Sequence, residues 1–305
     1  MATKSDVGFV GIGEMGSRMI ERLLEAGHPV AVYDADKDRQ KEFARSHQVR
    51  SAETLKEVGE GVDFLITMLP DGHVVRNCYL EAEDGALAKV LKPGCIALDT
   101  SSSDPLGTRE LAKVLAERGI RWAEAPVSGG IVGAEKGELV FMVGGDSPET
   151  IEKCREVLDV MGHQSFVVGG VGNGHAMKCL NNYVSSTGFL AGLEALMIGA
   201  KFGLDPSIMV DVLNESTGRN HATRLTLKQE VLSREFATMF KLALQAKDVK
   251  IAACLADDLA LNAPLVRQAW ALLARSNETL GPGADHTETV KYYEKLNKMV
   301  LSAKQ

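Results

Sequence analysis

The chain has 305 residues, of which 45% are hydrophobic and 25% are charged, a composition typical of a folded globular protein with room for two domains. Its net charge of −7 argues against a nucleic-acid partner, because phosphate binding relies on clustered Lys and Arg. The five cysteines and seven histidines lack a CxxC pair and the spacing of metal ligands, so we expect no metal, free thiols and a cytoplasmic location. No signal-peptide pattern precedes Val7, and no uncharged apolar run approaches about 18 residues, so we expect no membrane partner.

The first half of the chain alternates short β-branched runs with stretches of helical periodicity. The predicted strands are 7–12, 29–33, 64–68, 95–99, 121–125, 139–143 and 165–168. The predicted helices are 15–25, 36–47, 74–80, 105–117 and 148–161. This alternation predicts a mostly parallel sheet with helices on both faces, which is a doubly wound α/β domain of the Rossmann type over residues 1–172.

From residue 173 onward, only helical periodicity continues. The apolar stretch 176–202 predicts a helix of about 40 Å, at about 1.5 Å per residue, that stops at Gly203. Shorter helices are predicted at 206–214, 240–256, 265–279 and 287–301. Residues 173–305 are therefore expected to form an all-α domain, joined to the first domain by this long central helix. Because the helix is apolar nearly all round, we expect a second copy of the chain to complete this half, as a homodimer or homotetramer.

The segment after the first predicted strand has the spacing of a dinucleotide-binding loop. It consists of Gly11, Ile12, Gly13, Glu14, Met15 and Gly16, and it opens a predicted helix. The glycines permit a tight turn and close approach of a pyrophosphate, while the helix N-terminus offers N–H groups to the phosphates. Asp34 ends the next strand about 20 residues later, where a carboxylate binds the ribose hydroxyls and repels a 2′-phosphate. We therefore expect NAD as the cofactor, with NADP as the alternative because Lys37 and Arg39 lie close by.

Three segments in order along the chain carry a resemblance to a known family. They are the loop at 10–16, the sequence EAPVSGG at 124–130 and the sequence GNGHAMKCLNN at 172–182, with a shorter match at Lys247-Asp248. On these residues the chain resembles the 3-hydroxyisobutyrate dehydrogenase family, the β-hydroxyacid dehydrogenases related to 6-phosphogluconate dehydrogenase. Two positions depart from the family pattern: Glu124 stands where the family has Asp, and Ser102 stands where it usually has Thr.

The resemblance implies oxidation of a small 3-hydroxy carboxylic acid, such as 3-hydroxyisobutyrate, to its semialdehyde by NAD, or the reverse reaction. It makes Lys178 the general base, or the general acid in the reverse direction. Asn182 follows one helical turn later, where it can bind the substrate hydroxyl or orient the lysine. Lysine has an ordinary pKa of about 10.4, so this role requires partial desolvation, which the start of a long apolar helix beside the cofactor would favour.

Further positions are expected to bind the substrate and the cofactor. Ser128, Gly129 and Gly130 follow a predicted strand and expose a hydroxyl and backbone N–H groups, which suit a substrate carboxylate, and the resemblance implies the same role. Just past two other strands, Leu69, Pro70 and Ser102 are expected to line the cofactor. By resemblance, Lys247 is expected to reach the nicotinamide end of the cofactor or the substrate carboxylate. Asp248 is interpreted as structural and His175 as a polar residue at a helix start.

Two other functions remain open at the level of the sequence. One is a reductase of small aldehyde acids, of the glyoxylate or succinic semialdehyde type, which would often prefer NADPH; Asp34 argues against it. The other is a non-catalytic NAD-binding sensor, in which Lys178 and Ser128 could be lost; both are present. No feature of the sequence identifies which group the substrate has at carbon 2, so several 3-hydroxy acids are compatible with the same chemistry.

Overall fold

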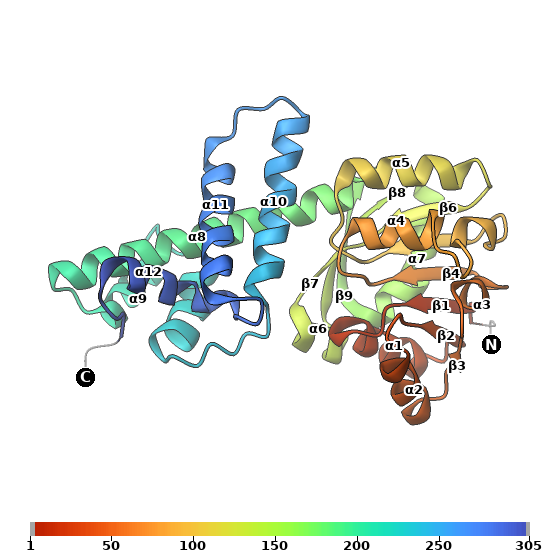
Figure 1. Ribbon diagram of the computed structural model, residues 1–305, viewed down its shortest axis with the longest axis horizontal. Helices are drawn as coiled ribbons and strands as arrows, with labels where there is room; N and C mark the ends of the chain where they lie inside the picture. Colours follow the sequence, from red (N-terminus) through yellow and green to blue (C-terminus); the bar gives the residue numbers. More distant parts are fainter. Residues whose placement is uncertain (1–3, 303–305) are drawn as a thin grey trace. The chain divides into compact units, whose positions relative to one another are not determined.

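The computed structural model describes residues 4–302. The chain divides within one helix into two compact units, the first ending at Lys178 and the second beginning at Cys179. The first unit contains a sheet with helices, the second contains helices, and α8 (Asn173–Phe202) belongs to both (Figure 1). The predicted fold class is confirmed: a doubly wound Rossmann-type α/β unit is followed by an all-α unit, with a long helix leading from one to the other.

The sheet of the first unit has the strand order β3-β2-β1-β4-β5-β6-β8-β7, with β9 paired to β8. Its strands are β1 (Val7–Val10), β2 (Val30–Tyr33), β3 (Arg50–Ser51), β4 (Phe64–Thr67), β5 (Ile96–Asp99), β6 (Arg121–Glu124), β7 (Val127–Ser128), β8 (Leu139–Gly145) and β9 (Gly162–Gly169). The six strands β3, β2, β1, β4, β5 and β6 follow one another across the sheet and are parallel. Strand β8 is antiparallel to both β6 and β7. Burial on both faces explains why the central strands β1, β4 and β5 are mostly apolar rather than alternating, with polar Thr67 and Asp99 only at the carboxyl ends of β4 and β5. The chain order reverses at β1, so its carboxyl end is the expected ligand edge.

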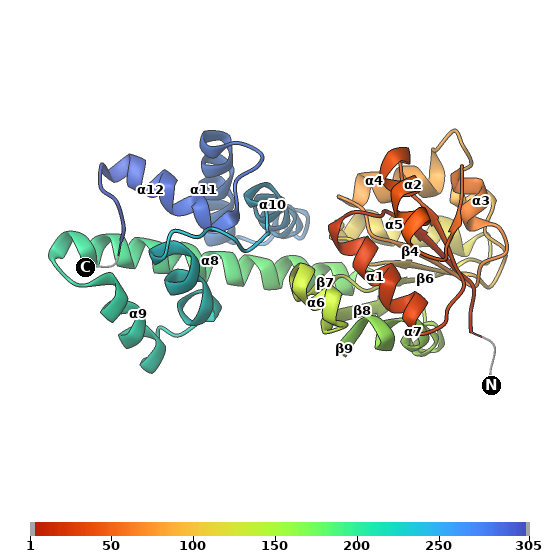
Figure 2. The ribbon, with the colours of Figure 1, turned by 90° about the horizontal axis from the view of Figure 1, so that it is seen from below.

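Helices cover both faces of this sheet (Figure 2). They are α1 (Glu14–Glu25), α2 (Lys37–Ser46), α3 (Leu55–Gly59), α4 (Gly72–Leu80), the 3-10 helix η1 (Leu87–Lys89), α5 (Pro105–Ala116), α6 (Gly130–Lys136) and α7 (Pro148–Met161). Leu23 of α1 and Leu158 of α7 belong to the apolar core on one face. Tyr79 of α4 and Leu115 of α5 belong to the core on the other, with Trp122. The apolar stripe of each helix therefore explains its place against the sheet.

The second unit contains the rest of α8 and a set of shorter helices. These are α9 (Pro206–Glu215), the π-helix η2 (Ala222–Leu232), α10 (Leu242–Asp258), α11 (Pro264–Leu280), the 3-10 helix η3 (His286–Glu288) and α12 (Thr289–Asn297). Leu193 and Leu196 of α8 share a core with Val249 of α10 and Leu273 of α11. By length and composition alone, α8 is apolar enough to cross a bilayer, with 44% of its most apolar window buried inside the structure. Core helices of globular proteins pass the same test, and Leu190, Leu193 and Leu196 of α8 lie in such a core.

Several elements differ from the sequence prediction. The last predicted helix, 287–301, is too long, because α12 ends at Asn297 and Lys298 has a left-handed φ of 50°. The helix predicted at 240–256 begins only at Leu242. Strands β3 and β7 and helices α3 and α6 were not predicted, since two to seven residues are too few to show a periodicity. The π-helix was also missed, because its sequence lacks an amphipathic repeat at the α-helical period.

Candidate active site

The glycine loop between β1 and α1 leaves open space beside its backbone. Gly11 has a φ of 103°, and a Cβ on it would collide with the carbonyl oxygen of Met68, while a Cβ on Gly16 would collide with that of Gly11. A Cβ on Gly13, in contrast, would meet no described atom within 4 Å. Gly13 is also the N-cap of α1 and supplies no side-chain hydrogen bond to the first turn. With Ile12, Glu14 and Met15 completing the loop, this geometry fits the pyrophosphate of a dinucleotide.

Asp34 joins the end of β2 to this loop. Its Oδ2 accepts a hydrogen bond from Ile12 N at 2.6 Å, and its Oδ1 accepts one from Asp36 N at 2.8 Å. The guanidinium of Arg39 lies 3.7 Å from Asp34 Oδ1 and 3.3 Å from Asp36 Oδ2. Of the two cations that left the cofactor preference open, Arg39 is therefore already paired with two carboxylates. The other, Lys37, donates from Nζ to Gln40 Oε1 at 3.2 Å and to Glu53 O at 2.9 Å.

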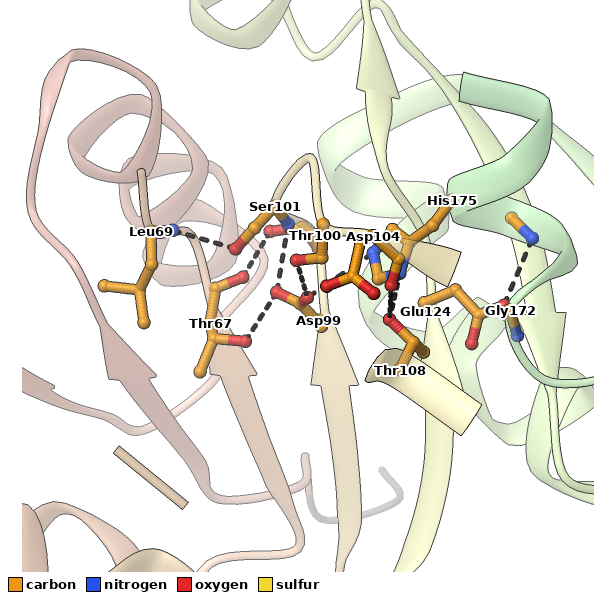
Figure 3. A network of polar contacts seen from close by, with 12 residues as sticks. Thr67, Leu69, Asp99, Thr100, Ser101, Asp104, Thr108, Glu124, Gly172 and His175 are labelled. Carbon is orange, nitrogen blue, oxygen red and sulfur yellow. Dashed lines mark hydrogen bonds and ion pairs between the residues drawn. The ribbon is translucent and has the colours of Figure 1, made fainter. Parts of the chain in front are cut away.

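The residues expected to line the cofactor follow neighbouring strands. Leu69 and Pro70 come after β4, and Ser102 comes after β5, which pairs with β4. Leu69 N donates to Ser101 Oγ at 2.9 Å, which joins the two strand ends (Figure 3). A Cβ on Gly11 would also lie 3.1 Å from Leu69 Cδ2, so Leu69 borders the glycine loop. The structure thus brings these predicted residues to one edge of the sheet.

Glu124, at the end of β6, binds the beginning of α8. The side chain is fully buried, and its Oε1 accepts hydrogen bonds from Gly172 N at 2.7 Å and Gly174 N at 3.1 Å. Its Oε2 accepts from Trp122 Nε1 at 2.8 Å. A Cβ on Gly144 would collide with Glu124 Oε1, and one on Gly174 would lie 2.8 Å from its Cγ. A glutamate fits at this position because these two glycines leave room for its side chain.

The predicted carboxylate anchor follows β6 directly. Ser128 ends the two-residue strand β7, Gly129 is the N-cap of α6, and Gly130 is the first residue of that helix. Both glycines are exposed and have positive φ, 126° and 61°, a conformation that other residues adopt only with strain. In the sheet order, β6 is three strands from β1, on the same parallel edge. The anchoring role of these three residues stays a prediction.

Lys178 and Asn182 lie one turn apart on α8, Lys178 being the last residue of the first unit. Within the second unit, Asn182 Nδ2 donates to Asp248 Oδ2 at 2.5 Å, and Asn182 Oδ1 accepts from Asn181 Nδ2 at 3.1 Å. Lys247 Nζ lies 3.2 Å from Asp248 Oδ1. Asp248 is only 3% exposed, so one buried carboxylate fixes the side chains of both Asn182 and Lys247.

His175, in the first turn of α8, is more than a polar residue at a helix start. It is buried, with Nδ1 2.8 Å from Thr108 Oγ1 and Nε2 3.4 Å from Asp99 Oδ2 (Figure 3). Neither Asp99 nor Glu124 was assigned a function from the sequence. The signal that could have identified them is their position: like Asp34, each is an acidic residue at the carboxyl end of a predicted strand.

Comparison with known proteins places the chain among its relatives. Residues 6–170 match the NAD-binding domain of 6-phosphogluconate dehydrogenase, and residues 172–293 match a family described as NAD-binding of NADP-dependent 3-hydroxyisobutyrate dehydrogenase. The chain belongs to the 3-hydroxyisobutyrate dehydrogenase family. The resemblance expected from the motifs is therefore confirmed.

Individual relatives of this family agree with the match. Mitochondrial 3-hydroxyisobutyrate dehydrogenase of Bos taurus is 40% identical over 220 residues, which span 72% of this chain and 64% of that protein. 2-(Hydroxymethyl)glutarate dehydrogenase of Eubacterium barkeri is 33% identical over 301 residues, 98% of each chain. The structure of 3-hydroxyisobutyrate dehydrogenase from Mycobacterium tuberculosis with L-serine has a TM-score of 0.88 at 28% identity, covering 95% of this chain and 99% of that one. The description of the first matched family names NAD, and that of the second names both NAD and NADP. The match therefore shows an NAD(P)-binding domain, and the preference between NAD and NADP does not follow from it.

Proposed function

We propose that this member of the 3-hydroxyisobutyrate dehydrogenase family oxidises a small 3-hydroxy carboxylic acid to its semialdehyde with NAD, or catalyses the reverse reaction. The observation that carries the proposal is the pair formed by Lys178 and Asn182 on α8, with the amide of Asn182 held by the buried Asp248. The dinucleotide loop of the first unit supports it, as do the names of the bovine and Eubacterium relatives, both dehydrogenases of hydroxy acids.

In this proposal the nicotinamide cofactor, bound at the glycine loop, supplies the hydride acceptor. Lys178 accepts the hydroxyl proton of the substrate as its carbonyl forms, and the ammonium returns a proton in the reverse direction. Asn182 binds the same hydroxyl in a fixed orientation, because both ends of its amide already have partners. Ser128 and the N–H groups after it hold the carboxylate, and Lys247 offsets its negative charge.

The main experiment follows NADH formation by its absorbance across a panel of 3-hydroxy acids. The panel contains 3-hydroxyisobutyrate, serine, 3-hydroxypropionate and 2-(hydroxymethyl)glutarate. Lys178→Ala should lower kcat by about 100-fold or more for the acid that is turned over. Lys201→Ala, an exposed lysine near the other end of the same helix, is the matched control and should retain full activity. Binding of NAD without turnover of any acid, in either direction, would instead support the sensor function.

The preference for NAD is proposed from the charges at the end of β2. The carboxylate of Asp34 is held by two backbone N–H groups beside the loop, where it would repel a 2′-phosphate. Arg39 is engaged by Asp34 and Asp36 and does not offer an unopposed positive charge. The measurement is kcat/KM with NAD and with NADP, in the wild type and in Asp34→Ser. We expect NAD to be preferred and the preference to shrink in the variant; a higher kcat/KM with NADP in the wild type would contradict the proposal.

We also propose that the protein is a homodimer or homotetramer. Large apolar side chains are exposed on two consecutive helices of the second unit: Ile198 (70%) and Phe202 (85%) on α8, and Ile208 (63%) and Val212 (58%) on α9. Apolar patches of this kind mark interaction sites, and a second copy offers the same patch for two-fold pairing. Light scattering coupled to size-exclusion chromatography tests this; a monomer at micromolar concentration would contradict it.

A further inference from the structure

A buried glutamine on α2 holds the acidic residue that follows β2. We propose that Gln40 is a positioning residue that makes the nucleotide site prefer an adenosine ribose without a 2′-phosphate, a role that rests on the proposed binding of NAD beside Asp34. Gln40 is only 1% exposed and lies one helical turn after Asp36, the N-cap of α2. It acts on the site in two ways, through the backbone of Asp34 and through the side chain of Lys37.

All four hydrogen-bonding positions of the Gln40 side-chain amide are occupied. Its Oε1 accepts from the backbone N–H of Asp34 at 3.0 Å and from Lys37 Nζ at 3.2 Å. Its Nε2 donates to Ser51 Oγ at 2.8 Å and to the carbonyl oxygen of Ala52 at 2.7 Å. The orientation of the amide is determined, because a backbone N–H can only donate and a carbonyl can only accept. Gln40 therefore joins the end of β2 to the end of β3 in one arrangement (Figure 1).

The first contact fixes Asp34 through its backbone as well as through its carboxylate. The two carboxylate oxygens accept from Ile12 N at 2.6 Å and from Asp36 N at 2.8 Å. A carboxylate has about four acceptor positions, so about two remain for ribose hydroxyls. These positions keep their direction only while the main chain of Asp34 stays in place, and its N–H bond to Gln40 provides that restraint. Because Asp34 is only 8% exposed, loss of this bond would leave a buried N–H without its partner.

The second contact restrains a cation beside this carboxylate. Lys37 Nζ also donates to Glu53 O at 2.9 Å and lies 3.9 Å from the centre of the Tyr33 ring. That ring is held in turn, because Tyr33 Oη donates to Asp84 Oδ2 at 2.8 Å. An ammonium group released from such contacts is a mobile point charge that binds phosphate well. By engaging Lys37, Gln40 keeps this charge from a 2′-phosphate.

The two cations of the segment 34–40 are held by different kinds of groups. Arg39 lies within 4 Å of two carboxylates, those of Asp34 and Asp36. Lys37 is held by an amide oxygen, a carbonyl oxygen and an aromatic ring, all of which are neutral. Hydrogen bonds between two charged groups are the stronger kind, so the hold on Lys37 is the weaker of the two. Removal of the Gln40 amide should therefore release Lys37 and leave Arg39 paired.

Two adenosine fragments that differ only in the 2′-phosphate test this role without any turnover. They are adenosine 5′-monophosphate and adenosine 2′,5′-bisphosphate, and titration calorimetry measures the dissociation constant of each. We expect the wild type to bind the monophosphate more tightly. Methionine has a similar length and no hydrogen-bonding amide, so in Gln40→Met this preference should fall by about 10-fold or more, the factor typical of a hydrogen bond to a charged group. Gln48→Met, at an exposed glutamine just after α2, is the matched control and should keep the wild-type preference.

Lys37→Met separates the two effects of Gln40. In the wild-type background the lysine is engaged, so its removal should change the preference by less than about twofold. In the Gln40→Met background the same change should restore part of the preference, because no released ammonium remains to bind the 2′-phosphate. A larger rise in preference for Lys37→Met alone would show that this lysine already reaches the phosphate. That result would overturn the proposal even where Gln40→Met does not fold.

Steady-state kinetics distinguish this positioning role from a general loss of structure. In Gln40→Met, KM for NAD should rise about fivefold or more, while kcat at saturating NAD changes less than about twofold. Equal weakening of both fragments, or an unchanged preference in the folded variant, would overturn the role of Gln40 and leave the proposed function intact. A wild type that binds the bisphosphate more tightly would instead reject the proposed preference for NAD, and the role of Gln40 with it.

Discussion

Replacing Glu124 by glutamine tests how the sheet holds the first turn of helix α8. Glu124 is fully buried, and its two oxygens accept three hydrogen bonds, from Gly172 N, Gly174 N and Trp122 Nε1. Glutamine has the same shape with one oxygen and one NH2 group. If its oxygen stays with the two glycine N–H groups, its NH2 group faces the indole N–H of Trp122. At least one buried donor therefore loses its partner.

The magnitude follows from these contacts. A buried donor without a partner costs about 1–3 kcal/mol. Loss of a negative charge at a helix N-terminus lowers the stability by about 0.5–2 kcal/mol more, and the larger values apply where the charge is buried. We therefore expect Glu124→Gln to lower the free energy of unfolding of the first unit by about 1.5–5 kcal/mol. Because Lys178 lies on the same helix, kcat should fall as well.

Urea unfolding followed by tryptophan fluorescence measures this loss. The chain has two tryptophans, Trp122 in the first unit and Trp270 in the second, so Trp270→Phe makes the signal specific for the first unit. Glu117→Gln, an exposed glutamate after α5, is the control and should change stability by less than about 0.5 kcal/mol. A loss for Glu124→Gln no larger than that of the control would refute the view that this carboxylate anchors α8.

Three further predictions concern the loop, the second unit and the thiols. Gly11→Ala should destabilise the fold by several kcal/mol, about 1–3 from its positive φ and more from collision with a backbone carbonyl. Gly13→Ala should cost less than about 1 kcal/mol yet weaken NAD binding in titration calorimetry, and unchanged binding would contradict the role of the loop. Asp248→Asn should lower kcat about 10-fold or more by releasing the two side chains it holds, with NAD binding as the internal control. Burial raises the pKa of Cys154 to about 12, so iodoacetamide at about pH 8 should spare it in the native protein and modify the exposed Cys254, as mass spectrometry can verify.

Local patterns in the sequence were enough to predict most of the fold. The alternation of apolar runs and helical stretches predicts the parallel sheet, because a strand or a helix of several turns imposes its own period on the residues that it buries. The loop from Gly11 to Gly16 was also predictable. Its glycines are required by a tight turn and by close contacts between backbone atoms, and the spacing of the glycines over six residues already indicates both. Elements of two to seven residues, such as β3 and α6, show no period and were missed.

By itself, the sequence determined the class of each unit, the place of the glycine loop between β1 and α1, and the spacing of Lys178 and Asn182 on one helix. Only the tertiary structure decided what surrounds them. Glu124 binds a turn about 50 residues away in sequence, and Asp248 binds Asn182 from another helix. A buried carboxylate is stable only where donors from distant segments converge on it, and that convergence is a property of the packed chain. No local window of residues contains it, which is why the contacts of Glu124 and Asp248 became evident only in the folded protein.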